Sequence, residues 1–486
     1  MEKIVMKVKQ FIIDNKYFLI CFSIPLIIFL LFLLAYYPGI ISYDGNNQWQ
    51  QVQSGLITNS HPFFSTYFML LLSKIHNNPT VVFIYQIILF SIIWGYFCNL
   101  INQKSKNKFI IIIFTIFMCL TPIMALYSIS LWKDIIYSYY LLAIVVIIYK
   151  GIQNNFKYKL SDFILFGILL ALICNYRHNG ILVAIMYMCL ILIIALFNKK
   201  RINKNIVKKI TMIFISFISV MLIIAIPKKY YLNNYSKYRV KVETKSEREN
   251  SISIKTKYIL WMMGAHLKEG NVTNSNDIDF LNKIINIKKW KKIYNPYIIN
   301  PISNYEHING KIVNDNPKKL YKMFLKYTKK YPMTIVKHYI NCDALEIDPF
   351  SQRRTYLYIF DFSDIENLNF NKVIKSKLPY FQNVYTRIVY FSLMTGVKYL
   401  YQPALILYLN IIMLIILSKK VFGKKIYLLG TPMILNTISL LPINLAQDLR
   451  YVYINFLNFF IILLVFIINY KKIFKKSVRK NIWYNL

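Results

Sequence analysis

The sequence predicts an all-α, polytopic membrane protein with about ten transmembrane helices. Hydrophobic residues make up 56% of its 486 residues, and the mean hydropathy is +0.41. Residues 17–36 form an uncharged apolar run of about 20 residues, the length that a helix needs to cross a bilayer. Lys and Arg concentrate in the short segments between such runs, as expected for cytoplasmic loops. These observations exclude a soluble globular protein.

The N-terminal module is predicted to cover residues 1–227 and to cross the membrane seven times. Its basic tail, with Lys3, Lys7 and Lys9, places the N-terminus in the cytoplasm. The first apolar run is too long for a signal-peptide core and lacks a small-residue cleavage site, so we expect an uncleaved signal anchor. The seven predicted spans cover residues 17–36, 79–101, 109–127, 135–149, 163–175, 181–197 and 210–226.

Residues 228–400 form a polar stretch without a convincing span. Because seven spans that start from a cytoplasmic N-terminus end outside, we expect this stretch to be a large extracytoplasmic domain between spans 7 and 8. We expect it to be mainly helical. Leu320 and Tyr327 fall on one face of a helix predicted over residues 318–330, and Pro332 suits the first turn of the next helix.

The C-terminal module, residues 401–486, is predicted to hold three spans and a basic cytoplasmic tail. Both termini of this cell-membrane protein are therefore expected in the cytoplasm. Residues 381–396 are also apolar enough for a span. A span there would put the last basic clusters outside, so we expect an interfacial helix instead. The three predicted spans cover residues 401–417, 426–442 and 451–468.

The formal net charge of +40 does not indicate a nucleic-acid partner, because no nucleic-acid-binding motif organises the Lys residues. The charge is better explained as a topology signal and as attraction to anionic lipid of the bilayer. The six Cys residues have no spacing typical of a disulfide framework or a zinc site. No glycine-rich phosphate loop is present, which argues against a nucleotide-driven engine.

Asp44 is the most informative candidate residue. It follows the first span directly, so its carboxylate is expected at the outer membrane surface, where a lipid-linked substrate presents its head group. Tyr37, Tyr43 and Trp49 surround it in sequence, although aromatic residues are also ordinary interface anchors. The alternative is that Asp44 and Gly45 simply form a turn.

Six further candidates map to the same predicted surface, although they are far apart in sequence. Arg grips phosphate bidentately, so several cations at this depth could stabilise an anionic leaving group. Each also has a plainer interpretation: a loop histidine, a helix N-cap aspartate, or an arginine snorkelling to the surface. The candidates are His61, Lys133, Asp134, Arg177, Arg450 and Tyr451, with Asp134 the second candidate catalytic carboxylate beside Asp44.

These segments resemble the GT-C superfamily of integral membrane glycosyltransferases, in particular bacterial relatives of the protein O-mannosyltransferase and lipid A aminoarabinose transferase families. The resembling motifs are Ser-Tyr-Asp at residues 42–44, Ser-His-Pro-Phe-Phe at 60–64, Leu-Trp-Lys-Asp at 131–134, Asn-Tyr-Arg-His-Asn-Gly at 175–180 and Asp-Leu-Arg-Tyr at 448–451. The resemblance covers the N-terminal seven spans; for the outer domain it is only architectural.

The resemblance implies inverting transfer of one sugar from a polyprenyl-phosphate donor to an extracytoplasmic acceptor. Asp44 would act as general base, and Arg450, Arg177 and Lys133 would stabilise the departing phosphate. No cofactor is certain; a divalent metal is an option, although Gly45 stands where several relatives have a second acid.

Two alternatives remain at this point. A polysaccharide polymerase or ligase also has many spans, but its key basic residues would lie in the large loop. A lipid-linked saccharide flippase would have a polar central cavity, whereas the predicted span interiors are nearly free of charge. The sequence leaves open the donor sugar and the acceptor, which could be a polysaccharide, a glycolipid or a protein.

Overall fold

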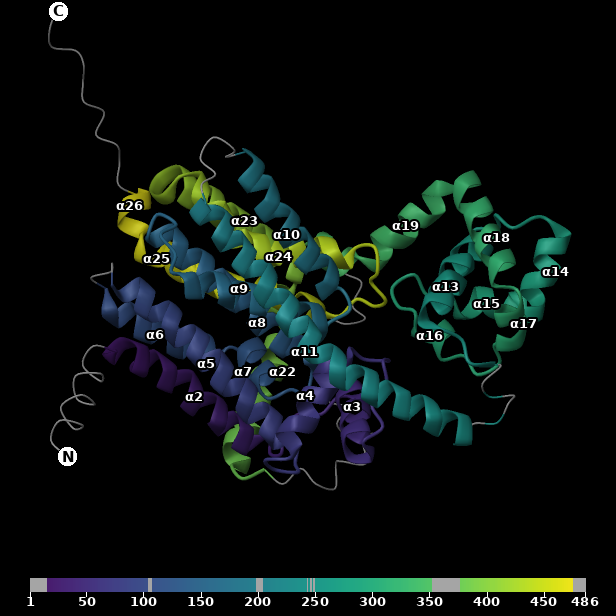
Figure 1. Ribbon diagram of the computed structural model, residues 1–486, viewed down its shortest axis with the longest axis horizontal. Helices are drawn as coiled ribbons and strands as arrows, with labels where there is room; N and C mark the ends of the chain where they lie inside the picture. The colour runs from purple at the N-terminus through teal and green to yellow at the C-terminus, as the bar shows by residue number, and fades with distance from the viewer. Residues whose placement is uncertain are drawn as a thin grey trace, which may run out of the picture.

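The computed structural model describes residues 15–103, 107–197, 204–242, 244, 247, 250–351 and 376–474. Within these residues every named element is a helix, and only two isolated β-bridges occur. The predicted all-α fold is therefore confirmed for the described part of the chain. Figure 1 shows a bundle of long helices beside a group of shorter helices that includes α13 to α19.

The bundle contains the apolar helices. Six are long and apolar enough to cross a membrane, and a bent pair, α6 and α7, brings the number to seven. The structure thus supports a polytopic membrane protein but does not confirm ten spans. The bundle helices are α2 (Lys16–Ala35), α5 (Thr80–Asn102), α6 (Lys108–Leu120), α7 (Pro122–Ser128), α8 (Lys133–Gln153), α9 (Leu160–Tyr176), α10 (Gly180–Phe197), α11 (Lys204–Val242), α23 (Pro403–Leu417), α24 (Thr431–Leu440) and α25 (Tyr453–Ile468).

Helix length explains why fewer than ten described helices qualify as spans. Helix α9 has 17 residues, which rise about 26 Å, short of the roughly 30 Å of a bilayer core. The predicted span over residues 426–442 is divided between the 3₁₀ helix η5 (Lys424–Gly430) and α24. Both α9 and α24 nevertheless pack within the bundle, α9 against α8, α10 and α11.

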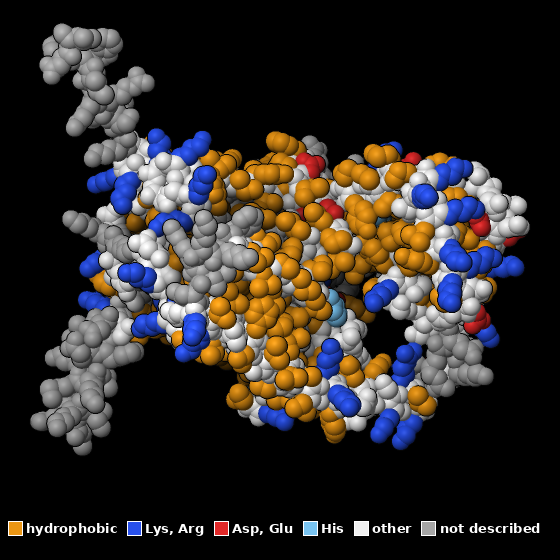
Figure 2. Space-filling view, turned by 45° about the horizontal axis from the view of Figure 1, so that its top comes forward, with side chains coloured by type: hydrophobic (Ala, Val, Ile, Leu, Met, Phe, Trp, Pro, Cys, Tyr) orange, Lys and Arg blue, Asp and Glu red, His pale blue; other side chains and the backbone are white. Residues whose placement is uncertain are grey.

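The surface of the molecule agrees with a membrane environment. Hydrophobic side chains cover the middle of the molecule in Figure 2, whereas Lys and Arg side chains gather at the left end and on the right. Apolar residues are also exposed on three bundle helices, with Ile27 on α2, Ile185 on α10 and Ile223 on α11 as examples. Such a surface is suited to contact with lipid chains.

The smaller group of helices has its own hydrophobic core, which is separate from that of the bundle. Leu320 and Tyr327 are buried on one face of α18, and α19 begins with Pro332, as the sequence predicts. Helix α11 continues past Pro227 to Val242 before this domain begins. The domain helices are α13 (Ile254–Lys268), α14 (Ser275–Ile284), α15 (Ile287–Ile293), α16 (Asn300–Ser303), α17 (Gly310–Asp315), α18 (Pro317–Lys330), α19 (Pro332–Cys342) and α20 (Ala344–Ile347).

One segment packs on the bundle and another joins the bundle to the domain. Helix α22 (Pro379–Met394), expected to be interfacial, packs its Tyr385 ring against Phe32 of α2, with ring centroids 4.4 Å apart. The connection between α24 and α25 runs across the domain, where the backbone N–H of Ile299 donates to the Leu445 carbonyl at 2.9 Å. The same connection then leads into η6 (Leu449–Val452) at the start of the last long helix.

Candidate active site

The first and second polar connections of the bundle are joined by a short parallel bridge between Ile40 and Ser130. The Ile40 N–H donates to the Ile129 carbonyl, and the Leu131 N–H donates to the Ile40 carbonyl, both at 2.8 Å. Gly45 allows the close approach that follows, because a Cβ there would clash with the Leu131 carbonyl oxygen. This contact brings the segment after α2 against the start of α8.

Asp44 lies in a helix rather than in the loop or turn that the sequence indicates. Helix α3 (Tyr43–Ser54) begins after Ser42, whose hydroxyl accepts a hydrogen bond from the Gly45 N–H at 3.2 Å. The Asp44 carboxylate pairs with Arg450 through an Nη2–Oδ2 distance of 2.8 Å. Its side chain keeps 30% of its surface exposed, so this carboxylate can meet a substrate.

Asp134 is fully buried in the first turn of α8. Its Oδ1 lies 2.9 Å from Arg177 Nε, and its Oδ2 lies 3.9 Å from both Lys133 Nζ and Arg450 Nε. The N-cap residue of α8 is Trp132, without a side-chain cap, so the interpretation of Asp134 as an N-cap is wrong. Asp134 is instead the buried counter-ion of the neighbouring cations.

Arg450 is the centre of the cluster, because it faces three carboxylates. Besides Asp44 and Asp134, its Nε lies 2.7 Å from Asp448 Oδ2. Asp448 also caps η6, since its Oδ1 accepts the Arg450 N–H at 3.1 Å. Asp448 belongs to the Asp-Leu-Arg-Tyr motif but is not among the predicted site residues, although its place two residues before Arg450 could have identified it.

Aromatic rings hold the two guanidinium groups in place. The Arg177 Cζ lies 4.5 Å from the centroid of the Tyr451 ring, and Arg177 Nη1 donates to the Tyr451 carbonyl at 3.2 Å. The Arg450 Cζ lies 5.4 Å from the Trp132 ring. Arg177 is buried between a carboxylate and a ring, so it does not snorkel to the surface as a lone arginine would.

The protonation states of the accessible groups follow from these contacts. Burial alone would raise the pKa of Asp44, but Arg450 and Lys133 outweigh it and hold this pKa well below its usual range. Burial, with Lys133 nearby, lowers the pKa of His61 to about 4. Burial raises the pKa of Asp448 even though Arg450 opposes the shift. At neutral pH the cluster therefore holds an ionised Asp44 and a neutral His61.

All seven candidate residues thus share one site, to which the structure adds Asp448. Three carboxylates face three cations, Lys133, Arg177 and Arg450, at the end of the bundle where α2 and α9 finish and α8 and α25 begin. Such an array can bind an anion by exchanging carboxylate partners for phosphate oxygens. Among the described residues no group of three His, Cys, Asp or Glu side chains has the geometry to hold a metal ion.

Comparisons with known proteins add no functional assignment. No protein-family model, curated protein or solved structure matches this chain. The GT-C resemblance therefore rests on the short motifs of the sequence alone, and function has to be inferred from the chemistry of the cluster.

Proposed function

We propose that the protein is a GT-C-type glycosyltransferase of the cell membrane, which transfers a sugar from a polyprenyl-phosphate donor to an acceptor hydroxyl. One observation carries this proposal: Asp44, Arg177 and Arg450, from helix ends far apart in sequence, meet in a single charged site. The site lies at the end of apolar helices, the depth at which a lipid-linked phosphate resides.

The cations of the site suit a lipid phosphate. Arg450 exchanges its contact with Asp44 for a phosphate oxygen of the donor, whose negative charge increases as the sugar leaves and so strengthens the contact. Arg177 and Lys133 add positive charge beside it, since both lie against Asp134. This arrangement stabilises the charge that develops as the phosphate leaves.

Asp44 is the best general base of the site, because it is the most exposed of the three acids. While it is paired with Arg450 its pKa is low and its basicity is weak. Loss of that partner to the phosphate raises its pKa and frees its carboxylate for the acceptor. The acceptor proton passes to Asp44, the acceptor oxygen bonds to the anomeric carbon, and the bond from that carbon to the phosphate oxygen breaks with inversion.

Asp134 and Asp448 have a positioning role in this proposal rather than a direct one. Asp134 is buried and touches Arg177, and Asp448 holds Arg450 through Nε, whereas Asp44 pairs with Nη2. Removing either acid would leave a guanidinium without its counter-ion. The Tyr451 ring supports Arg177, and His61, as a neutral imidazole, is available to donate a hydrogen bond to the donor or acceptor.

The proposed orientation puts this site and the α13–α20 domain outside the cytoplasm and both termini inside. The site lies past the C-terminal end of α2, whereas the N-terminus of the chain precedes its other end. Basic segments lie at the helix ends away from the site, as the positive-inside rule requires for the cytoplasmic side. The domain is suited to select the acceptor, because the connection that it binds leads directly into Asp448 and Arg450.

The flippase alternative is less well supported. Buried amides within the bundle are bonded to neighbouring helices: Asn410 Nδ2 donates to the Asn455 carbonyl at 2.9 Å, and Asn458 Nδ2 to the Leu429 carbonyl at 3.0 Å. These amides act as contacts between helices rather than as the lining of a polar path. A polymerase or ligase is expected to have its key basic residues in the large loop, whereas the three cations of the site lie at the ends of bundle helices.

The test of the proposal is the substitution Asp44→Asn. The amide cannot accept the proton, so we expect a loss of roughly a hundredfold to ten-thousandfold in transfer rate while the protein inserts and folds. The measurement is release of free polyprenyl phosphate from a polyprenyl-phosphate sugar in detergent, with candidate acceptors supplied. Asp277→Asn in the outer domain is the matched control and should keep normal turnover.

Two outcomes contradict the proposal. Near-normal transfer by a folded Asp44→Asn protein would remove Asp44 as the base. Movement of an intact lipid-linked sugar across sealed vesicles, with no cleavage in detergent, would identify a flippase instead.

A further inference from the structure

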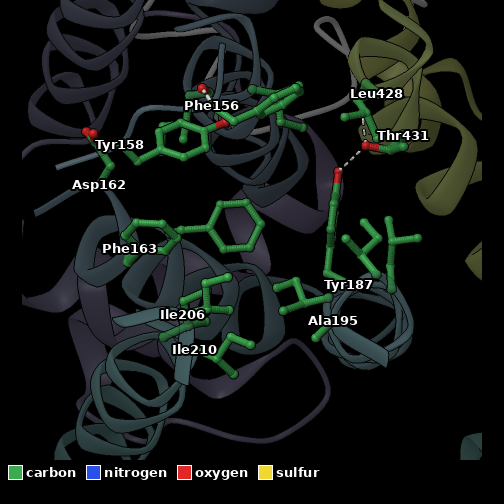
Figure 3. Close-up of a pocket in the computed structure, with 17 residues that line it drawn as sticks. Phe156, Tyr158, Asp162, Phe163, Tyr187, Ala195, Ile206, Ile210, Leu428 and Thr431 are labelled. Carbon is green, nitrogen blue, oxygen red and sulfur yellow. Dashed lines mark hydrogen bonds between the residues drawn. The ribbon is translucent and has the colours of Figure 1, made fainter. Parts of the chain in front are cut away.

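An apolar cavity of about 430 Å³ lies between α8, α9, α10, α11 and the η5–α24 segment. Figure 3 shows Phe163, Tyr187 and Ile210 pointing into it from three different helices. Its volume falls within the roughly 300–1,000 Å³ typical of ligand sites. The site described above does not use this cavity.

The few polar groups in its wall are already bonded to protein. The Tyr187 hydroxyl lies 3.2 Å from the Thr431 hydroxyl, and the Tyr158 hydroxyl donates to the Ile147 carbonyl at 3.3 Å. The Asp162 carboxylate accepts from Lys150 Nζ at 2.6 Å and from the Lys159 N–H at 2.9 Å. The remaining lining is hydrocarbon, which favours an apolar occupant over water.

The cavity and the charged site lie at opposite ends of the same helices. Asp134 is in the first turn of α8, whereas Ile147 and Ile148 of the cavity wall are in its last two turns. Arg177 follows the end of α9, whereas Asp162 and Phe163 are at its beginning. The cavity therefore lies at the level of the other leaflet, which the predicted topology assigns to the cytoplasmic side.

The rim of the cavity is basic. Lys209 Nζ lies 5.5 Å from the centroid of the Phe163 ring, and among the described carboxylates none is within ion-pair distance of it. Lys425 Nζ is held by the Ile152 carbonyl and the Asn155 side chain, each at 3.1 Å. Lys157 and Lys159 flank Tyr158 in sequence and are exposed. Asp162, the single acid in the wall, is already neutralised by Lys150.

We propose that this cavity binds one acyl chain of an anionic phospholipid, with the phosphate of the lipid held by the basic rim at Lys209. The apolar wall selects a hydrocarbon chain, and the unneutralised rim selects a negative head group over a zwitterionic one. This lipid would fill the space between α10 and the α9–α11 pair and fix α10 in the bundle. The inference does not depend on the proposed transferase activity.

The test measures lipid retained by the full-length protein. The purified chain is equilibrated in detergent with equal amounts of phosphatidylglycerol, phosphatidylcholine and polyprenyl phosphate, exchanged into fresh detergent, and analysed by native mass spectrometry. We expect one phosphatidylglycerol per protein. Ala195→Trp, which fills the cavity from α10, should reduce retention at least fivefold, and Lys209→Gln should reduce the preference for phosphatidylglycerol about fivefold.

Two matched controls accompany these variants. Ala225→Trp makes the same change at an exposed position of α11 away from the cavity, and Lys208→Gln removes an exposed charge beside Lys209; both should retain lipid as the unaltered chain does. Equal retention of the two phospholipids, or full retention by Ala195→Trp, would overturn the proposal. Preferential retention of polyprenyl phosphate would also overturn it and assign the cavity to the substrate. If Ala195→Trp aggregates, the proposal is tested instead by lipid retention in Ala195→Leu, which should be reduced, and by the preference for phosphatidylglycerol in the unaltered chain.

Discussion

Two groups of acids contact the connection between α24 and α25, and they differ in whether a cation is present. At its end, Arg450 and its neighbouring cations face Asp44, Asp134 and Asp448. A few residues earlier, Asn444 Nδ2 donates to Asp343 at 3.0 Å and to Glu346 at 3.1 Å, and no described cation pairs with either acid.

The two groups therefore differ in charge. Cations hold the pKa of Asp44 well below its usual range, whereas burial raises the pKa of Asp343 to about 7 and that of Glu346 well above its ordinary value. Burial raises the pKa of acids in both groups, and cations reverse that shift for Asp44 but not for Asp448. The cations of the first group keep Asp44 ionised, whereas the second group holds protons and fixes the connection against the domain.

The largest effect on stability and activity is expected from removing Arg450, the cation that the three acids of the first group share. Arg450→Ala leaves three carboxylates without their common partner in a buried setting, so we expect a loss of about 3–5 kcal/mol in stability together with loss of activity. Arg450→Lys keeps the charge but loses the planar fork, and should be intermediate in transfer rate. Thermal unfolding in detergent and the transfer assay measure both. A stable, fully active Arg450→Ala protein would contradict this account of the cluster.

A smaller effect on stability, with a defined pH dependence, is expected from substituting Asp343 in the second group. The pKa of Asp343 is about 7 in the folded protein and about 3.9 in an unfolded chain. The folded form therefore keeps its proton while the unfolded form loses it, so this contribution to stability is complete below about pH 4 and disappears as pH rises to 7.

Asp343→Asn carries no titrating proton and should remove that slope. Relative to the unaltered chain, the variant should gain about 2 kcal/mol between pH 5 and pH 7.5, measured as the difference in thermal unfolding at each pH. Burial lowers the pKa of His266 and His338 to about 4, and these groups favour the folded state as pH rises. Their effect is common to both proteins and cancels in the difference. A difference that does not change with pH would contradict the raised pKa.

The sequence predicts much of the first group and none of the second. Charge patterns assign helix ends to membrane faces, so the sequence alone places Asp44, Asp134, Arg177 and Arg450 on one surface. It does not predict their pairing, because the pairing depends on the contact of Gly45 with Leu131 and on helix packing. Likewise α3 is expected to be a loop, since its polar residues have no apolar periodicity.

The second group is invisible in the sequence for a different reason. Asn444 and Asp343 are 101 residues apart, and nothing near either residue indicates burial of an acid. Only the path of the connection across the domain brings them together. Ten spans are not confirmed for a third reason: apolar composition locates a helix better than it measures its length, as the 17 residues of α9 show.

The smallest effect on stability is expected where the cation of an ion pair is exposed to solvent. Asp277 pairs with Lys326 at 2.8 Å, and Lys326 keeps 54% of its side-chain surface exposed. Water and salt screen such a pair, so Asp277→Asn should cost less than about 1 kcal/mol, even though Asp277 also accepts from the Tyr327 hydroxyl. Unfolding at low and high salt measures the cost, which should shrink as salt is added. A loss of stability as large as that of Arg450→Ala would contradict this comparison. It would mean that ion pairing alone, without burial of the cation, accounts for the stability that the first group contributes.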